Sequence, residues 1–156
     1  MSFPFTVTYS SRLTISVTDA NKTHVLGCIH DMLLKKSAKA VTVGSYEVGF
    51  KGSTSPWRGS LMGSVDKGIF TLIEKGGITI LTYKFYFIQL FIVTPIMGLA
   101  FGLFSRSIWI GVGAFLWLGG MNWVIAIVRH HALLQEISEQ LNNDLATYEG
   151  KQSIKS

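Results

Sequence analysis

The sequence predicts an α+β membrane protein with three parts: an N-terminal cytoplasmic antiparallel sheet with one helix, a two-helix transmembrane hairpin, and a C-terminal amphipathic helix. Three observations predict this fold class. Arg106 is the only side chain of fixed charge between Phe85 and Val128. Before this block, apolar residues recur with a period of two or of 3.6, and after it they form a stripe at helical spacing.

Composition agrees with this fold class. The chain has 156 residues, of which 48% are apolar, and it carries 14 Lys and Arg against 9 Asp and Glu. Its single cysteine, Cys28, excludes an internal disulfide and suits a reducing compartment. The first residues lack the basic cluster and apolar run of a signal peptide, so we expect the N-terminal part to stay in the cytoplasm.

Residues 1–82 are predicted to form the cytoplasmic α+β domain. Thr18 or Asp19 is a suitable cap for a helix, and the apolar residues that follow have helical spacing. Period-two alternation before and after this helix predicts strands, with Gly44-Ser45 as a turn or a bulge. The expected order is β-β-α-β-β-β-β, which favours an antiparallel sheet with one helix on a face. The predicted strands are 3–9, 12–18, 40–50, 60–65, 68–74 and 78–85.

Residues 83–129 are predicted to be the transmembrane hairpin. Helices over 85–104 and 108–128 each have about 20 residues, the length that crosses the ~30 Å hydrocarbon core. Arg106 lies in the turn, because a charge at mid-depth costs about 3 kcal/mol or more. The alternative is a pair of buried helices in a soluble protein. Helices that are apolar all round need surrounding protein, and the upstream segment is too small to supply it.

The flanking charges predict the orientation. Lys75, Lys84 and Arg129 flank the two predicted helices, 85–104 and 108–128, and only Arg106 lies in the turn between them, so the positive-inside rule places both termini in the cytoplasm. We therefore expect an integral protein of the inner or plasma membrane. The aromatic residues near the expected interfaces are Tyr83, Tyr86, Trp109 and Trp123.

Small and polar residues inside the hairpin predict helix packing. The G-x-x-x-G spacing lets two backbones approach closely, either within one hairpin or between copies, and the sequence leaves both open. Amides inside the spans are expected to seek partners on neighbouring helices. Pro95 is expected to kink the first helix. The candidate packing residues are Gly98, Gly102, Gly113, Gly120, Gln89 and Asn122.

Residues 130–150 are predicted to be a cytoplasmic amphipathic helix, with residues 151–156 as a flexible tail. Its apolar stripe consists of Leu134, Ile137, Leu141 and Leu145, continued by Tyr148. The stripe is too short for an independent coiled coil. Its expected partner is the N-terminal domain, another copy or a different protein.

No catalytic, cofactor or metal site is predicted. His24 and His30 are six residues apart on a helix and do not share a face. A phosphate-loop pattern fails, because Phe50 stands between Gly49 and Lys51. His130 and His131 read as polar residues at the membrane edge. The candidate headgroup or anion contacts are Lys51, Trp57 and Arg58, with Trp57 alternatively covering the core.

These observations predict a non-enzymatic two-pass membrane protein that assembles through its hairpin and presents a cytoplasmic binding or regulatory domain. The expected partners are the lipid bilayer, further copies of the chain and other membrane subunits, without nucleic acid or a cofactor. One alternative is a ligand-gated pore-forming or membrane-perturbing effector with a cytoplasmic sensor. Another is an enzyme at the membrane surface that uses His24, His30, Asp31 and Arg58.

Overall fold

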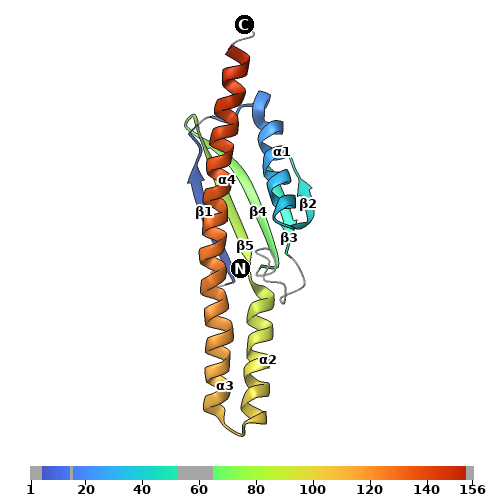
Figure 1. Cartoon of the computed structure of the whole chain (residues 1–156), viewed down its shortest axis with the longest axis vertical. Helices are drawn as coiled ribbons and strands as arrows, with labels where there is room; N and C mark the ends of the chain where they lie inside the picture. Colours follow the sequence, from blue (N-terminus) through green and yellow to red (C-terminus); the bar gives the residue numbers. More distant parts are fainter. Residues whose placement is uncertain (1–4, 15, 53–64, 154–156) are drawn as a thin grey trace.

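The computed structural model describes residues 5–14, 16–52 and 65–153, which form one five-stranded antiparallel sheet and three helices (Figure 1). The third helix is long and has three consecutive parts, labelled α3, η3 and α4. The sheet lies at one end of the elongated molecule, and α2 and α3 form the other end. The elements are β1 (Thr6–Arg12), α1 (Asp19–Lys35), β2 (Lys39–Val43), β3 (Glu47–Lys51), β4 (Lys67–Lys75), β5 (Ile78–Tyr86), α2 (Ile88–Phe104), α3 (Ile108–Phe115), the π-helical η3 (Leu116–Met121) and α4 (Asn122–Ser153).

The sheet has the strand order β1-β5-β4-β3-β2, and one of its faces is covered by helices. Val48 pairs with Phe70, and Phe70 pairs with Tyr83, so these residues form one row across three strands. All three side chains are buried. Helix α1 lies over β2 and β3, and α4 lies over β1. The core therefore sits between this face and the two helices.

The segment before α1 differs from the prediction. The predicted strand 12–18 is wrong, and only β1 precedes α1 in the described residues. The backbone N–H of Leu13 donates to the Thr79 carbonyl, and that of Thr14 donates to Oδ1 of Asn142 at 2.8 Å. Val17 N–H donates to Oγ1 of Thr79. The Leu13 donor continues the pairing of β1 with β5 by one bond. The donors of Thr14 and Val17 go to side-chain oxygens instead, which ends the ladder.

The segment after α1 forms two strands joined by a turn. The segment 40–50 was predicted as one alternating unit with a turn or bulge at Gly44-Ser45. In the structure Gly44 N–H donates to the Glu47 carbonyl at 2.7 Å, so a turn separates β2 from β3. The predicted strand 60–65 lies outside the described residues except for Val65, which is buried but not part of a strand.

The prediction of a two-helix transmembrane hairpin is wrong. By length and composition, one helix of the described residues could cross a membrane, over Ile108–Thr147. Helix α2 has 17 residues, a length of about 26 Å against a hydrocarbon core of ~30 Å. The first three residues of the predicted helix 85–104 are not helical. Phe85 and Tyr86 belong to the sheet, where they pair with β1, and Phe87 is buried in the core.

The C-terminal amphipathic helix is not a separate element. The chain stays helical from Ile108 through η3 into α4, so the predicted boundary near Val128 does not interrupt it. No Gly or Pro lies between Asn122 and Tyr148 to end a helix there. The structure places the predicted stripe against the chain's own N-terminal sheet. Its four buried members are Leu134, Ile137, Leu141 and Leu145.

Candidate functional site

The candidate site is the apolar end of the molecule, which we define as residues 88–128. Exposure of its apolar side chains is greatest near the turn between α2 and α3, where Phe104 is 92% exposed and Trp109 is 80% exposed. Of the exposed large hydrophobic side chains in the described residues, five lie outside this end: Phe5, Leu34, Val43, Tyr46 and Ile73. The apolar end thus presents to its surroundings the residue types that the sheet end keeps inside.

Helices α2 and α3 meet along small residues, which we call the glycine seam: Thr94, Gly98 and Gly102 of α2 against Gly111 of α3 and Gly119 of η3. A Cβ added at Gly111 would lie 2.7 Å from the Gly98 carbonyl oxygen, and one added at Gly98 would lie 2.8 Å from Cβ of Phe115. Both distances are too short for a side chain. Gly98 and Gly102, predicted to pack helices, therefore pack against the chain's own α3.

The other two predicted packing glycines lie away from this seam. A Cβ added at Gly113 or Gly120 would meet nothing within 4 Å among the described residues. Both residues are exposed on the outside of the long helix. They remain free for contact with lipid or with another protein.

Polar side chains of the apolar end bond to their own helices. Oγ1 of Thr94 donates to the Leu90 carbonyl at 2.8 Å, and Nδ2 of Asn122 donates to the Leu118 carbonyl at 2.5 Å. Gln89 is exposed, and its backbone N–H donates to Oδ2 of Asp66. Helix α2 continues through Pro95. The predicted amide partners on a neighbouring helix are therefore not present within the described chain.

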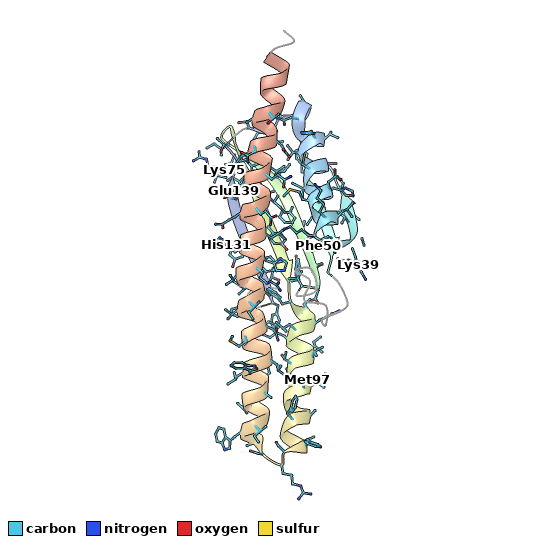
Figure 2. The ribbon with its side chains drawn as sticks, viewed as in Figure 1. Lys39, Phe50, Lys75, Met97, His131 and Glu139 are labelled. Carbon is cyan, nitrogen blue, oxygen red and sulfur yellow. The ribbon has the colours of Figure 1, made fainter. Side chains whose placement is uncertain are left out.

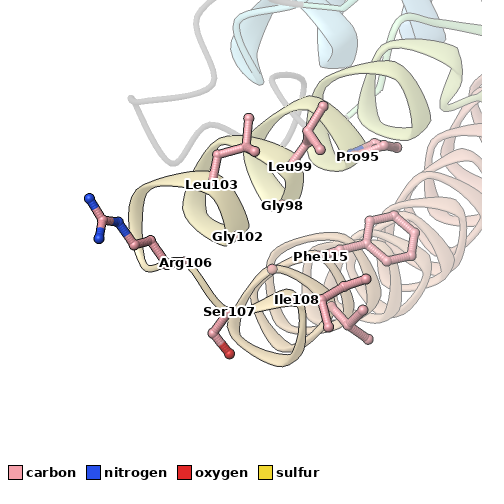
Figure 3. Close-up of a pocket in the computed structure, with 11 residues that line it drawn as sticks. Pro95, Gly98, Leu99, Gly102, Leu103, Arg106, Ser107, Ile108 and Phe115 are labelled. Atoms are coloured by element: carbon pink, nitrogen blue, oxygen red, sulfur yellow. The ribbon is translucent and has the colours of Figure 1, made fainter.

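A groove of about 620 Å³ runs along the seam between α2 and α3 (Figure 3). Gly98, Gly102 and Gly111 lie along it, and Leu99 and Leu103 of α2 point outward beside it. Arg106 stands at the turn with its guanidinium directed away from the helices. Its φ of 53° is left-handed. Arg106 N–H donates to the Leu103 carbonyl and Ser107 N–H to the Gly102 carbonyl, which is a Schellman ending for α2.

The junction between sheet and apolar end carries basic residues. Lys51, one of the predicted anion contacts, ends β3 and pairs with Lys67 at the start of β4. Trp57 and Arg58 lie outside the described residues. Tyr86 follows on β5, opposite Lys67, and its ring lies 4.4 Å from Nζ of Lys67. Sequence reasoning missed Lys67, although the alternating pattern of β3 and β4 places both lysines on the outer face.

A buried polar pair lies where α4 crosses the sheet. The Tyr83 hydroxyl lies 2.7 Å from Nδ1 of His130, and the His130 ring stacks on Phe85 with centroids 4.8 Å apart. Burial raises the pKa of Tyr83 well above its ordinary value. The predictions of Tyr83 and His130 as residues at a membrane interface are therefore wrong. The stripe of α4 indicates this, because His130 lies four residues before Leu134.

Helix α1 holds the remaining candidate side chains. Sγ of Cys28 lies 3.8 Å from Nε2 of His24, and Nδ1 of His30 lies 3.0 Å from Asp31. Burial raises the pKa of the Cys28 thiol, so the reactive thiolate is disfavoured. In the part of the chain that the structure describes, no three His, Cys, Asp or Glu side chains are grouped to hold a metal ion.

No protein-family model, curated protein or solved structure matches this chain.

Proposed function

We propose that this protein is a non-enzymatic, membrane-anchored protein. Its apolar end inserts into a lipid bilayer from the cytoplasmic side, and its sheet, α1 and the C-terminal half of α4 form a cytoplasmic binding or regulatory domain. Through the apolar end it assembles with further copies or with other membrane subunits. Both termini lie in the cytoplasm, at the inner or plasma membrane.

The exposure of the apolar end carries this proposal. Burying one Leu, Ile or Phe side chain away from water stabilises a protein by about 1.5–3 kcal/mol. Phe104, Ile108 and Trp109 are each at least three-quarters exposed. Insertion into lipid would remove all these side chains from water. The contact between α2 and α3 would not have to change.

The packing of α4 on the sheet supports placing both termini on the same side of the membrane. Oγ of Ser11 lies 2.7 Å from Oγ of Ser138, and Nζ of Lys36 lies 2.7 Å from Glu136. These contacts join β1 and the residue after α1 to the middle of α4. Lysines near the junction then favour the cytoplasm for this side, since basic residues are enriched there.

Assembly is supported by the surface that the glycine seam leaves unused. Gly98 and Gly102 are occupied by α3, so another helix would approach instead along Gly113 and Gly120, where space is open. Small residues in this position let a second backbone come close. Crosslinking in native membranes tests this step. Gly113→Leu with Gly120→Leu should reduce the crosslinked dimer, and unchanged crosslinking would contradict assembly through this surface.

Fluorescence quenching by lipid tests the insertion. In a variant with Trp57→Phe and Trp123→Phe, only Trp109 and Trp117 emit. We expect brominated phosphatidylcholine in reconstituted vesicles to quench them strongly. The control replaces all four tryptophans by Phe and adds Glu139→Trp on the exposed side of α4, whose emission should persist. Unquenched Trp109 and Trp117, or protein that stays in the aqueous fraction without detergent, would contradict the proposal.

Cysteine labelling tests the side of insertion. In a Cys28→Ser background, Ser10→Cys and Glu139→Cys place single thiols at exposed positions of β1 and α4. A membrane-impermeant maleimide should label both only after cells are opened. Labelling of either position in intact cells would contradict the cytoplasmic placement.

The alternative of a ligand-gated pore remains an untested prediction. Thr94 and Asn122 bond to carbonyls of their own helices rather than lining a polar path. The described structure therefore offers no specific observation in favour of a pore.

A further inference from the structure

Three lysines stand in one row across neighbouring strands. Lys39 of β2 pairs with Lys51 of β3, and Lys51 pairs with Lys67 of β4. Residues directly opposite each other on paired strands have Cβ atoms about 4.5–5.5 Å apart and point to the same face. We call Lys39, Lys51 and Lys67, together with Lys84 of β5, the basic row.

The basic row lies on the face of the sheet that the helices leave uncovered. Phe50 precedes Lys51, and Phe85 follows Lys84, and both rings are buried in the core on the opposite face. All four lysines are exposed. The ring of Tyr86 lies between two of them, 4.4 Å from Nζ of Lys67 and 5.5 Å from Nζ of Lys84.

Within the described residues, no carboxylate forms an ion pair with the basic row. The ion pairs among the described residues lie elsewhere, and they join Lys22 to Asp19, His30 to Asp31 and Lys36 to Glu136. The nearest acidic residue in sequence, Asp66, accepts the backbone N–H of Gln89. Like charges directly opposite each other destabilise a sheet. The row is therefore a cost to folding that an external anion would offset.

Protection of a sheet edge does not explain the whole row. Lysines on edge strands prevent sheets from pairing with other chains, and Lys39 lies on β2, which is an edge strand. Lys51 and Lys67 lie on β3 and β4, inside the sheet, where both sides of the strand are already paired. These two lysines need another reason.

The position of the row supplies that reason. Lys67 pairs with Tyr86, and the apolar helix α2 starts two residues later at Ile88. Two residues of extended chain cover about 7 Å, which is within the Debye length of ~8–10 Å at physiological salt. Figure 2 shows Lys39 near the junction with the apolar helices and Lys75 at the far end of the sheet.

We infer that the basic row binds the headgroups of anionic phospholipids at the bilayer surface. This inference rests on the proposed membrane insertion, which brings headgroups to the level of the junction. The lysines supply the charge, and the Tyr86 ring holds two of them in place. Each lysine near an anionic surface contributes up to about a fivefold preference for the anionic lipid.

The test uses the full chain reconstituted into phosphatidylcholine vesicles. Electron paramagnetic resonance of spin-labelled lipids measures the preference of the protein for phosphatidylglycerol over phosphatidylcholine. We expect a severalfold preference in the wild type, which weakens when salt is raised because screening increases. The triple variant Lys39→Gln, Lys51→Gln, Lys67→Gln should bring the two lipids close to equal.

A matched pair of single variants separates a located site from general basicity. Lys67 and Lys75 are the two ends of β4 and point to the same face, about 26 Å apart at ~3.3 Å per residue. Lys67→Gln should lower the preference, and Lys75→Gln should leave it unchanged. Equal effects of the two variants, or an undiminished preference in the triple variant, would overturn the inference.

The same experiment distinguishes this inference from the proposed function. A protein that fails to enter neutral phosphatidylcholine vesicles contradicts membrane insertion itself. A protein that enters them without preferring phosphatidylglycerol contradicts only the lipid-binding role of the row. Binding of a soluble polyphosphate that the triple variant abolishes, without any lipid preference, would also overturn the inference.

Discussion

The hydroxyl of Tyr83 on β5 and Nδ1 of His130 on α4 lie 2.7 Å apart in the interior of the molecule. The Tyr83 ring stacks on Phe70 with centroids 4.1 Å apart, and the His130 ring stacks on Phe85. This contact joins the middle of the sheet to the long helix, close to where that helix leaves the sheet for the apolar end. It therefore fixes the position of the sheet relative to the apolar end.

Removing the Tyr83 hydroxyl should weaken this joint. Tyr83→Phe keeps the ring stack but deletes a hydrogen bond between two buried side chains, which should lower the free energy of unfolding by about 1–2 kcal/mol. Chemical denaturation in mild detergent, followed by near-ultraviolet circular dichroism, measures it. Tyr46→Phe, at an exposed position, is the control and should change stability by less than about 0.5 kcal/mol.

The burial of Tyr83 should also make the free energy of unfolding depend on alkaline pH. The pKa of Tyr83 is raised in the folded state, because burial disfavours the phenolate. Below the ordinary pKa of about 10, both states keep the proton and stability is complete. Above it, the unfolded state ionises first, so stability should fall by about 1.4 kcal/mol per pH unit until the folded pKa is reached. Tyr83→Phe should show a shallower fall between pH 10 and 11, and identical slopes would contradict this.

A side chain added in the glycine seam should push α2 and α3 apart. Gly111→Ala places a methyl group 2.7 Å from the Gly98 carbonyl oxygen, and such overpacking typically costs about 1–3 kcal/mol. Gly113→Ala, two residues along the same helix, meets nothing within 4 Å and should be neutral or stabilising by up to about 1 kcal/mol. Thermal unfolding in detergent compares the two variants. Equal effects would show that the close approach is not energetically important.

The end of α1 offers a stabilising substitution. Ser37 has a φ of 64° and follows a Schellman pattern, with Ala38 N–H donating to the Leu33 carbonyl and Ser37 N–H to the Leu34 carbonyl. Glycine avoids the left-handed cost of about 1–2 kcal/mol. Ser37→Gly should therefore raise the free energy of unfolding by about 0.5–1 kcal/mol, and Ser37→Ala should not. A loss of stability in the glycine variant would contradict this interpretation.

The sequence predicted the regular elements where one local signal dominated. Helical spacing of Val25, Ile29 and Leu33 predicted α1, and all three are buried in the structure. Alternation predicted strands over 68–74 and 78–85, which correspond to β4 and β5. It failed at 12–18, because an alternating pattern does not show which groups take the backbone donors. Those donors go to Thr79 and Asn142, distant in sequence.

The candidate site was predictable in kind but not in detail. The block whose one fixed charge is Arg106 located the apolar end, and the G-x-x-x-G spacing indicated Gly98 and Gly102. Which surface these glycines meet depends on the turn at Arg106, which brings Gly111 onto them. Likewise Lys51 was singled out by itself, whereas its alignment with Lys39 and Lys67 depends on strand register.

By itself, the amino-acid sequence determined which surfaces must be removed from water. The long block with Arg106 as its one fixed charge, the alternating strands and the stripe of α4 each follow from which side chains are apolar. Only the tertiary structure decided how those surfaces are shared. Phe85 and Tyr86 join the sheet rather than a helix, which shortens α2. The stripe of α4 is buried against the chain's own N-terminal part, and Tyr83 and His130 form a buried contact in the same packing. These contacts join residues that are distant in sequence, and local periodicity does not predict them.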